Sequence, residues 1–330
     1  MNGMTVDSTP FEDIRHLINT MPEPKSDAIE AVQTQMQGYV PDLKPFGQYS
    51  NALSWLAGWQ GRADPSIDRP LVAVFAGSHG VAKSVIGEDP VKGAQMRVAG
   101  VTKGAAGVRG MVAAFGAAFK VYEMGIEYPS ADMTKEASLS EHDCAAAIAF
   151  GMEVVAEGAD LIVLGNAGFG SATAAAAIAH GLFGGNAVYW AGGSGATAKT
   201  RITAVEEATA LHKAQLSDPL HVLRCFGGRD IAGMVGALIA ARHQSIPVIL
   251  DGYVVCAAAA VLHEISSGSL AHCYAGHLSA EPAHGALLDR LGLKPLLDAG
   301  IGVGDGTGGT LAMGTLMASA SGLKTAGQIL

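Results

Sequence analysis

Short apolar runs rich in β-branched residues alternate with alanine- and glycine-rich stretches through most of this chain. The runs that we expect to form strands are Leu71–Ala76, Phe119–Met124, Leu161–Gly165, Ala187–Ala191, Val248–Asp251 and Ala271–Ala275. Each lies in a largely apolar segment, which is typical of strands covered on both faces. Strand–helix alternation of this length indicates right-handed βαβ units. The sequence therefore predicts an α/β fold with an open parallel sheet of about six strands.

The segments between these runs have the composition of helices. We expect helices at Val91–Phe115, Ser140–Glu157, Ala172–Phe183, Thr203–Ala214, Asp230–Arg242 and Gly252–Ser266. Further helices, at Pro10–Met21, Ser26–Gln37 and Phe46–Gly61, are separated by prolines. We expect residues 1–66 to form the first part of a small helical domain and residues 67–284 to form the α/β domain. Residues 285–330 would complete the small domain with a glycine-rich loop and helices.

The composition excludes several classes of protein. The 21 basic and 30 acidic residues leave a net charge of −9, so no basic face is available for a nucleic acid. No apolar run approaches the ~18 residues of a membrane-spanning helix. The N-terminal sequence shows no secretory signal, so we expect a cytoplasmic protein. The cysteines are widely spaced without a CxxC pair, and we expect buried, reduced thiols at Cys144, Cys225, Cys256 and Cys273.

Glycines gather where the predicted strands end. The glycine-containing segments are Ala76–Val81, Gly165–Thr173, Gly192–Gly195, Asp251–Gly252 and Gly300–Gly309. In open α/β sheets, ligands bind outside the carboxyl ends of the strands. Glycine lets backbone N–H groups approach an anion, and a following helix N-terminus adds a positive dipole. We therefore expect a nucleotide-sized pocket, with Gly168–Thr173 as the best phosphate cradle and Gly192–Gly195 as a second.

Several familiar motifs are missing. Gly165-x-x-Gly168-x-Gly170 is not GxGxxG, and no acidic residue follows about 20 residues later, which argues against a dinucleotide-binding dehydrogenase. Neither a P-loop nor a GxSxG elbow is present. His277, Glu281 and His284 lie close in sequence, but HExxH spacing is absent. We interpret them as polar residues of a rim loop, and we expect no metal site.

Five side chains are candidates for acid–base or binding chemistry. Asp305 lies among glycines that cannot shield it, so we expect it to face a ligand. Asp251 either caps the following helix or contacts a ligand. His79 is a hydrogen-bonded turn former or a proton carrier. Glu281 holds ribose hydroxyls or pins a loop. Lys213 reaches a phosphate or is simply solvated.

Taken in order, six segments resemble one family, the nicotinate-nucleotide–dimethylbenzimidazole phosphoribosyltransferases. The segments are VAVFAGSHGV (72–81), EYPSADMTKEASLSEHDCAAAIAFGME (127–153), FGGRDIAGMVGALIAAR (226–242), IPVILDGYVVCAAA (246–259), AGHLSAEPAH (275–284) and LGLKPLLDAGIGVGDGTGG (291–309). The resemblance implies a Rossmann-like domain, a small helical domain built from both termini, and a homodimer. It also implies transfer of phosphoribose from nicotinate mononucleotide to a nitrogen of a benzimidazole-type base, without a cofactor or metal.

On this resemblance Asp305 is the catalytic residue, because a carboxylate takes the proton of the base in this family. The residues expected to bind substrate are Ser78, His79, Gln95, Asn166, Gly168, Gly170, Ser171, Thr173, Gly193, Gly195, Lys213, Asp251, Glu281 and Gly304.

The sequence departs from the family pattern at a few of these positions. The family's motif reads RLGEGTGA. In this chain Gly302 stands in place of its Arg and Asp305 in place of its Glu, and Asn166 stands in place of a second carboxylate of the family. Ser78 stands where the family has an acidic or amide residue. Two alternatives therefore stay open beside the transferase. One is a catalytically impaired paralogue that binds a mononucleotide or an aromatic base, and the other is an enzyme that hydrolyses a nucleotide.

Overall fold

The computed structural model describes residues 10–38, 46–193 and 195–326, and its centre is one parallel sheet of six strands. The strands are β1 (Pro70–Ala76), β2 (Ala118–Glu123), β3 (Leu161–Asn166), β4 (Val248–Leu250), β5 (Cys273–Leu278) and β6 (Pro295–Asp298). Their order is β2-β1-β3-β4-β5-β6, and every neighbouring pair is parallel. The chain builds outward from β1 first to one side and then to the other. The α/β class predicted from the sequence is confirmed.

One face of the sheet carries the larger core. Leu71, Ala73 and Phe75 of β1 point to this face and pack with residues of eight helices. These helices are α1 (Pro10–Asn19), α7 (Glu141–Gly151), α8 (Ser171–Phe183), α10 (Ala198–Leu211), α11 (Pro219–Phe226), α12 (Arg229–His243), α13 (Gly252–Ile265) and α14 (His284–Leu291). The short helices α4 (Ala82–Val85) and α9 (Ala187–Ala191) and the 3₁₀ turn Met152–Glu157 complete this side. A second 3₁₀ turn, Lys213–Gln215, follows α10.

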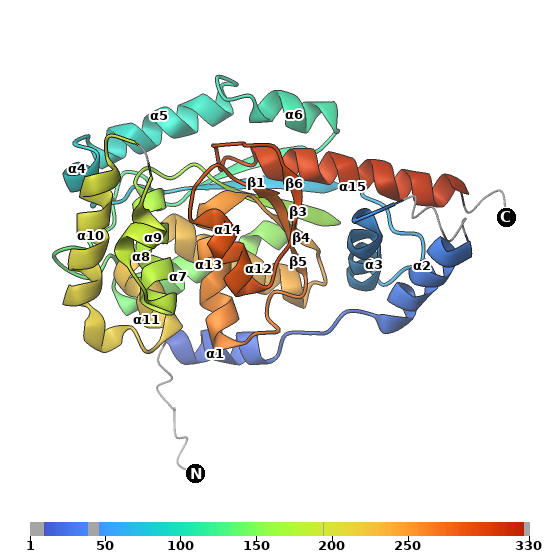
Figure 1. The fold of residues 1–330 in the computed structure, drawn as a ribbon, viewed down its shortest axis with the longest axis horizontal. Helices are drawn as coiled ribbons and strands as arrows, with labels where there is room; N and C mark the ends of the chain where they lie inside the picture. The colour runs from blue at the N-terminus through green and yellow to red at the C-terminus, as the bar shows by residue number, and fades with distance from the viewer. Residues whose placement is uncertain (1–9, 39–45, 194, 327–330) are drawn as a thin grey trace, which may run out of the picture.

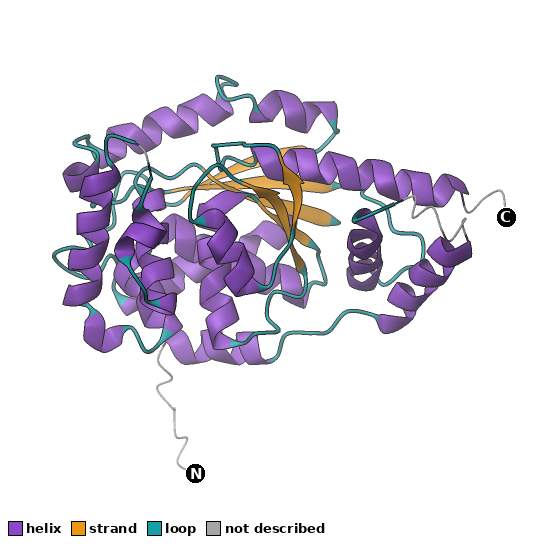
Figure 2. Ribbon diagram, viewed as in Figure 1, coloured by secondary structure: helices purple, strands orange, loops and turns teal. Residues whose placement is uncertain are grey.

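The opposite face has a smaller core, because the side chains of a strand alternate between faces. Val72, Val74 and Ala76 point to this side. The helices that cover it are α2 (Ser26–Gly38), α3 (Tyr49–Gln60), α5 (Pro90–Thr102), α6 (Val108–Ala114) and α15 (Thr307–Ala326). Figures 1 and 2 show the sheet as the middle layer, with α5, α6 and α15 along one side of it.

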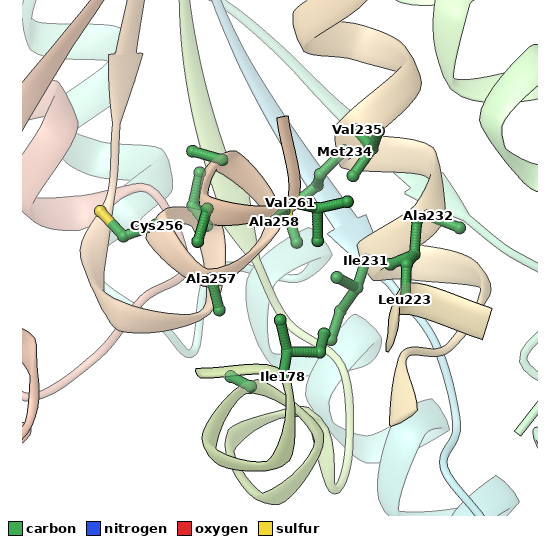
Figure 3. Close-up of a cluster of buried hydrophobic side chains, with 14 of the residues drawn as sticks. Ile178, Leu223, Ile231, Ala232, Met234, Val235, Cys256, Ala257, Ala258 and Val261 are labelled. Atoms are coloured by element: carbon green, nitrogen blue, oxygen red, sulfur yellow. The ribbon is translucent and has the colours of Figure 1, made fainter. Parts of the chain in front are cut away.

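Small residues let the helices of the larger core approach closely. Ala257 and Ala258 of α13 lie in one cluster with Ile178 of α8 and the apolar side chains of α12 (Figure 3). At Gly236 of α12, an added Cβ would lie 1.8 Å from the carbonyl oxygen of Ile148. Alanine and glycine residues of the sequence therefore allow close packing between these helices.

Five of the six expected strands are confirmed, with no end shifted by more than three residues. The expected strand Ala187–Ala191 is wrong, because this segment is helix α9. The Asn186 side chain caps it by accepting from the Val188 N–H, and Trp190 Nε1 donates to the Gly184 carbonyl. A run of five apolar residues cannot by itself distinguish a strand from a buried helix.

The sixth strand comes from the C-terminal region, where only a loop and helices were expected. Pro295–Asp298 pairs with β5 alone and forms the edge of the sheet. Its first residue is a proline, which lacks an N–H and is tolerated at a strand start on an edge. Residues 285–330 thus supply a strand to the sheet, although α15 also contacts α3. The division into two domains stays a prediction.

Candidate active site

A cavity of about 420 Å³ opens at the carboxyl ends of β3 to β6. This edge adjoins the point between β1 and β3 where the strand order reverses, which is the usual ligand site of an open α/β sheet. The described residues that line it are Arg97, Gly100, Val101, Ala106, Asn166, Ala167, Ser171, Ala172, Gly252, Tyr253, Val254, Ser279, Glu281, Gly302, Val303, Gly304 and Asp305. The cavity is large enough for a nucleotide-sized ligand.

Asn166, the last residue of β3, organises the wall below α8. Its Oδ1 accepts hydrogen bonds from the Ser171 hydroxyl (2.7 Å) and the Gly168 N–H (3.0 Å). Its Nδ2 donates to Asp230 Oδ2 at 2.8 Å. The amide is therefore fixed in one orientation by a carboxylate on one side and two donors on the other. A carboxylate at position 166 would face the carboxylate of Asp230, so an amide suits this site.

Asp230, in the first turn of α12, is fully buried behind this wall. Its Oδ1 lies 3.0 Å from His79 Nε2, and His79 is also buried. Burial alone would raise the pKa of the Asp230 carboxyl. The approach of His79 Nε2, together with hydrogen bonds from Asn166 and the Ile231 backbone, outweighs burial and holds this pKa below its ordinary value. Asp230 is thus an ionised support for Asn166 that does not line the cavity.

The opposite wall is the glycine-rich segment that carries Asp305. Asp305 Oδ1 accepts from the Thr307 hydroxyl (2.6 Å) and the Thr307 N–H (3.2 Å), at the start of α15. Within the described residues no hydrogen bond is found to Oδ2, and Asp305 lines the cavity and is partly exposed. One oxygen is therefore fixed by the helix start, and the other is available to a ligand.

Asp251, at the end of β4, holds this segment from beneath. It is fully buried and accepts the N–H groups of Gly306 at Oδ2 (2.6 Å) and of Gly309 at Oδ1 (2.7 Å). His277 Nε2 of β5 lies 3.0 Å from Asp251 Oδ1. Asp251 makes no side-chain cap of α13, so that expected role is wrong. It does not line the cavity, and its expected ligand contact stays a prediction.

The third wall combines α13 with the loop after β5. Glu281 Oε1 lies 2.8 Å from the Arg201 guanidinium, which also donates to the carbonyls of Ala191 and Gly192. This ion pair pins the loop, as one of the two expectations for Glu281 proposed. Tyr253 is buried, which raises the pKa of its phenol, and its hydroxyl donates to the Trp190 carbonyl.

The electrostatics of the cavity favour an anion at one end. The first residues of α8 and of α13 line it, and the start of α13 has no side-chain cap. Helix N-termini attract anions through free N–H groups and the helix dipole. Among the described lining residues Arg97 carries the one positive charge. It donates to the Gly168 carbonyl at 2.9 Å and lies over the Phe169 ring.

The structure brings five of the expected site residues to the cavity, namely Asn166, Ser171, Gly304, Asp305 and Glu281. Six others lie buried around it without lining it: Ser78, His79, Gly168, Gly170, Thr173 and Asp251. Ser78, for example, donates to the Ile126 carbonyl at 2.8 Å and so ties two loops together.

Four expected residues lie outside the cavity: Gln95, Lys213, Gly193 and Gly195. Gln95 is on the exposed side of α5, and Lys213 lines a different cavity beside His180. The segment Gly192–Gly195 includes residue 194, which lies outside the described residues, and its expected role as a second phosphate cradle stays a prediction.

Sequence reasoning missed Arg97, Tyr253 and Ser279 as lining residues and Asp230 as a buried support. Arg97 could have been found from its helix, because it lies four residues after the buried Gly93 and four before Val101, on one face of α5. Asp230 carried no local signal, since its partner Asn166 is 64 residues away.

Three further properties bear on the earlier expectations. The four cysteines are free and buried, as expected. No group of three metal-binding side chains occurs among the residues that the structure describes, and the expectation of no metal stays a prediction. Over the same residues, no helix has both the length and the apolar character to cross a membrane.

Comparisons with known proteins place this chain in a family. A family model described as phosphoribosyltransferase matches residues 21–328. A relative from Brucella abortus (strain S19) is 45% identical, over 98% of this chain and 97% of its own length. One from Methylocella silvestris is 44% identical, over 96% and 94%. Both are named nicotinate-nucleotide–dimethylbenzimidazole phosphoribosyltransferase.

A solved structure agrees with these relatives. The crystal structure of an enzyme of the same name from Thermus thermophilus superposes with a TM-score of 0.83 at 29% identity. The match covers 91% of this chain and 96% of that one. The chain therefore belongs to the phosphoribosyltransferase family that includes the nicotinate-nucleotide–dimethylbenzimidazole phosphoribosyltransferases.

Proposed function

We propose that this protein transfers phosphoribose from nicotinate mononucleotide to a ring nitrogen of a benzimidazole-type base. The observation that carries the proposal is the similarity to enzymes of this name at 44–45% identity over nearly the whole chain. The cavity supports it independently, because a carboxylate with one free oxygen stands in the same cavity as two helix N-termini and an arginine. No feature of the described residues favours the alternative of an impaired paralogue.

The mononucleotide would bind with its phosphate toward the starts of α8 and α13, with Arg97 as the nearby cation. Ser171 donates its hydroxyl proton to Asn166 Oδ1, which leaves its oxygen as an acceptor for a ribose hydroxyl. The acceptor base would then lie toward Asp305. This arrangement holds both substrates in one cavity and turns their encounter into a step within a single complex.

The reaction makes one bond and breaks one. A nitrogen lone pair of the benzimidazole forms a bond to the anomeric carbon, while the bond from that carbon to the pyridinium nitrogen breaks. The electron pair of the broken bond stays on that nitrogen, so nicotinate leaves with a neutral ring nitrogen. The N–H proton of the benzimidazole passes to Asp305, whose free oxygen acts as the general base.

A direct assay tests this function. The protein is incubated with nicotinate mononucleotide and 5,6-dimethylbenzimidazole, and the riboside phosphate and nicotinate are followed by chromatography. We expect equal amounts of both products, and none without the acceptor base. Saturable nucleotide binding without product would overturn the proposal and favour a non-catalytic binder. Ribose phosphate released without an acceptor would favour a hydrolase.

We also propose that the protein is a homodimer in the cytoplasm with a small helical domain built from both termini. The homodimer and the small helical domain rest on the resemblance described above, and the cytoplasmic location is the expectation given in the sequence analysis. Sedimentation of the purified protein tests the dimer: a mass of about 67 kDa, twice 33.5 kDa, is expected, and a mass of one chain would contradict it.

A further inference from the structure

The carboxylate of Asp305 is held through its backbone on both sides. The carbonyl of Gly304 accepts the N–H of Asn166 at 2.6 Å, so the residue before Asp305 is tied to the end of β3. The residue after it, Gly306, donates its N–H to Asp251 at the end of β4. Asp305 thus sits between two neighbouring strand ends.

The second of these ties depends on a buried charge. Asp251 is fully buried, and its carboxylate receives two N–H groups from the start of α15, at Gly306 and Gly309. A buried carboxylate is stable only when it is paired and hydrogen-bonded. The positive end of the α15 dipole adds to this compensation, and His277 Nε2 lies 3.0 Å from Asp251 Oδ1.

The packing leaves little room for this pair to shift. His277 is fully buried, and an added Cβ on Gly308 would lie 2.2 Å from its Cδ2. On the other side, the His284 ring lies edge-on with a centroid distance of 6.2 Å. His284 is itself held, because its Nδ1 accepts the N–H of Ser279 at 2.9 Å. Neither His277 nor Asp251 lines the cavity.

We propose that Asp251 and His277 form a positioning pair that fixes the glycine-rich segment 304–309 and thereby aims the free oxygen of Asp305 at the acceptor base. The pair acts through the backbone of Gly306 and touches no substrate. This inference rests on the proposed function, because it assigns the pair to the turnover step of that reaction. A general base must lie within about 2.6–3.2 Å of its proton, so a shift of the segment by about 1 Å would lower the rate about 100-fold.

The test compares His277→Gln with His272→Gln. Both histidines are fully buried at β5, but His272 contacts the Leu238 carbonyl, far from the segment 304–309. We expect His277→Gln to lower kcat about 10- to 100-fold, with the KM for nicotinate mononucleotide changed less than about threefold. His272→Gln should leave both constants near the wild-type values. Equal losses of kcat in the two variants would overturn the proposal.

A coupling experiment asks whether the pair acts through Asp305. In an Asp305→Asn background, His277→Gln should lower the residual rate much less than it does in the wild type, because the group that it positions is gone. Fully multiplicative losses would contradict the proposal. Asp251→Asn provides a second route to the same measurement, since it keeps the size of the side chain and places an NH₂ group against one backbone N–H.

Hydrogen exchange gives a readout that needs no activity. In His277→Gln, the amides of Gly306 and Gly309 should exchange at least about tenfold faster than in His272→Gln, after correction for global stability. Unchanged exchange at these amides would overturn the positioning pair even if the protein is an active transferase. Faster exchange in a protein that makes no riboside phosphate would overturn the proposed function and leave the positioning pair standing.

Discussion

Two buried histidine–aspartate pairs lie beneath the cavity, and they support different walls of it. His79 and Asp230 are 3.0 Å apart below the start of α8, and His277 and Asp251 are 3.0 Å apart below the start of α15. The first pair reaches the cavity through the neutral side chains of Asn166 and Ser171. The second reaches it through backbone N–H groups next to Asp305.

This difference indicates that the ends of the adjacent strands β3 and β4 support different functions of the cavity. Neutral hydrogen-bonding groups beside a helix N-terminus are suited to bind a sugar phosphate. A carboxylate with one oxygen free of hydrogen bonds is suited to accept a proton. The low content of charged residues in the chain, 15%, is consistent with this arrangement. The aspartates of the two pairs lie below the cavity, and Asp305 is the one aspartate among the described residues that lines it.

Two other buried histidines, His272 and His284, sharpen the comparison because no carboxylate of the described residues pairs with them. Burial lowers the pKa of His272 to about 3 and that of His284 to about 4. The unfolded chain therefore binds more protons than the folded protein below pH 6.5. The free energy of unfolding should fall by about 1.2 kcal/mol for each ring as the pH drops from 6 to 5.

Urea unfolding at several pH values measures this slope. His272→Gln should reduce this pH-dependent change by the contribution of one ring, about 1.2 kcal/mol between pH 6 and pH 5. A slope that is the same in wild type and variant would show that His272 is protonated in the folded protein.

A matched pair of glycine substitutions separates the two walls. In Gly168→Ala the new Cβ would lie 2.1 Å from Asp230 Oδ2, and in Gly308→Ala it would lie 2.2 Å from His277 Cδ2. Each should destabilise the fold by about 1–3 kcal/mol through overpacking. Steady-state kinetics should show a raised KM for nicotinate mononucleotide in Gly168→Ala and a lowered kcat in Gly308→Ala. A lowered kcat in Gly168→Ala together with a raised KM in Gly308→Ala would contradict the proposed roles of the two walls.

The smallest expected effect is at Ser171. Ser171→Ala removes one hydrogen bond to Asn166 Oδ1 and one acceptor from the cavity. A neutral hydrogen bond contributes about 1 kcal/mol, so the affinity for nicotinate mononucleotide should fall about fivefold. Calorimetric titration measures this affinity. The control is Ser84→Ala, because the Ser84 hydroxyl donates to the Val81 carbonyl away from the cavity. An unchanged affinity would show that Ser171 does not contribute to binding of nicotinate mononucleotide.

Much of this architecture follows from local sequence patterns. The apolar runs around residues 71–76 and 161–165 predicted central strands, and the glycines after them predicted the edge where the cavity lies. Asp305 was found because glycines on either side leave a carboxylate unshielded. These features depend on neighbouring residues, and a single sequence contains that information.

The site-residue predictions that differ from the structure depend on long-range contacts or on the orientation of a helix. Gln95 was chosen on α5, but the face of that helix turned to the cavity carries Arg97 instead. Lys213 follows α10 on a surface that the tertiary packing directs to another cavity. The role of Asp251 arises from residues 55 and 58 positions later in the chain, which no local pattern contains.

The most direct test of this account is to measure kcat and the KM for nicotinate mononucleotide in Asn166→Ala and Asp305→Asn side by side. Loss of the general base should lower kcat about 10²- to 10⁴-fold in Asp305→Asn, with KM nearly unchanged. Asn166→Ala should instead raise KM about tenfold or more, because it leaves the Asp230 carboxylate without one of its donors. The account assigns substrate binding to the wall around Asn166 and proton removal to the wall that carries Asp305. It is wrong if Asp305→Asn keeps its kcat, or if both variants change the same constant.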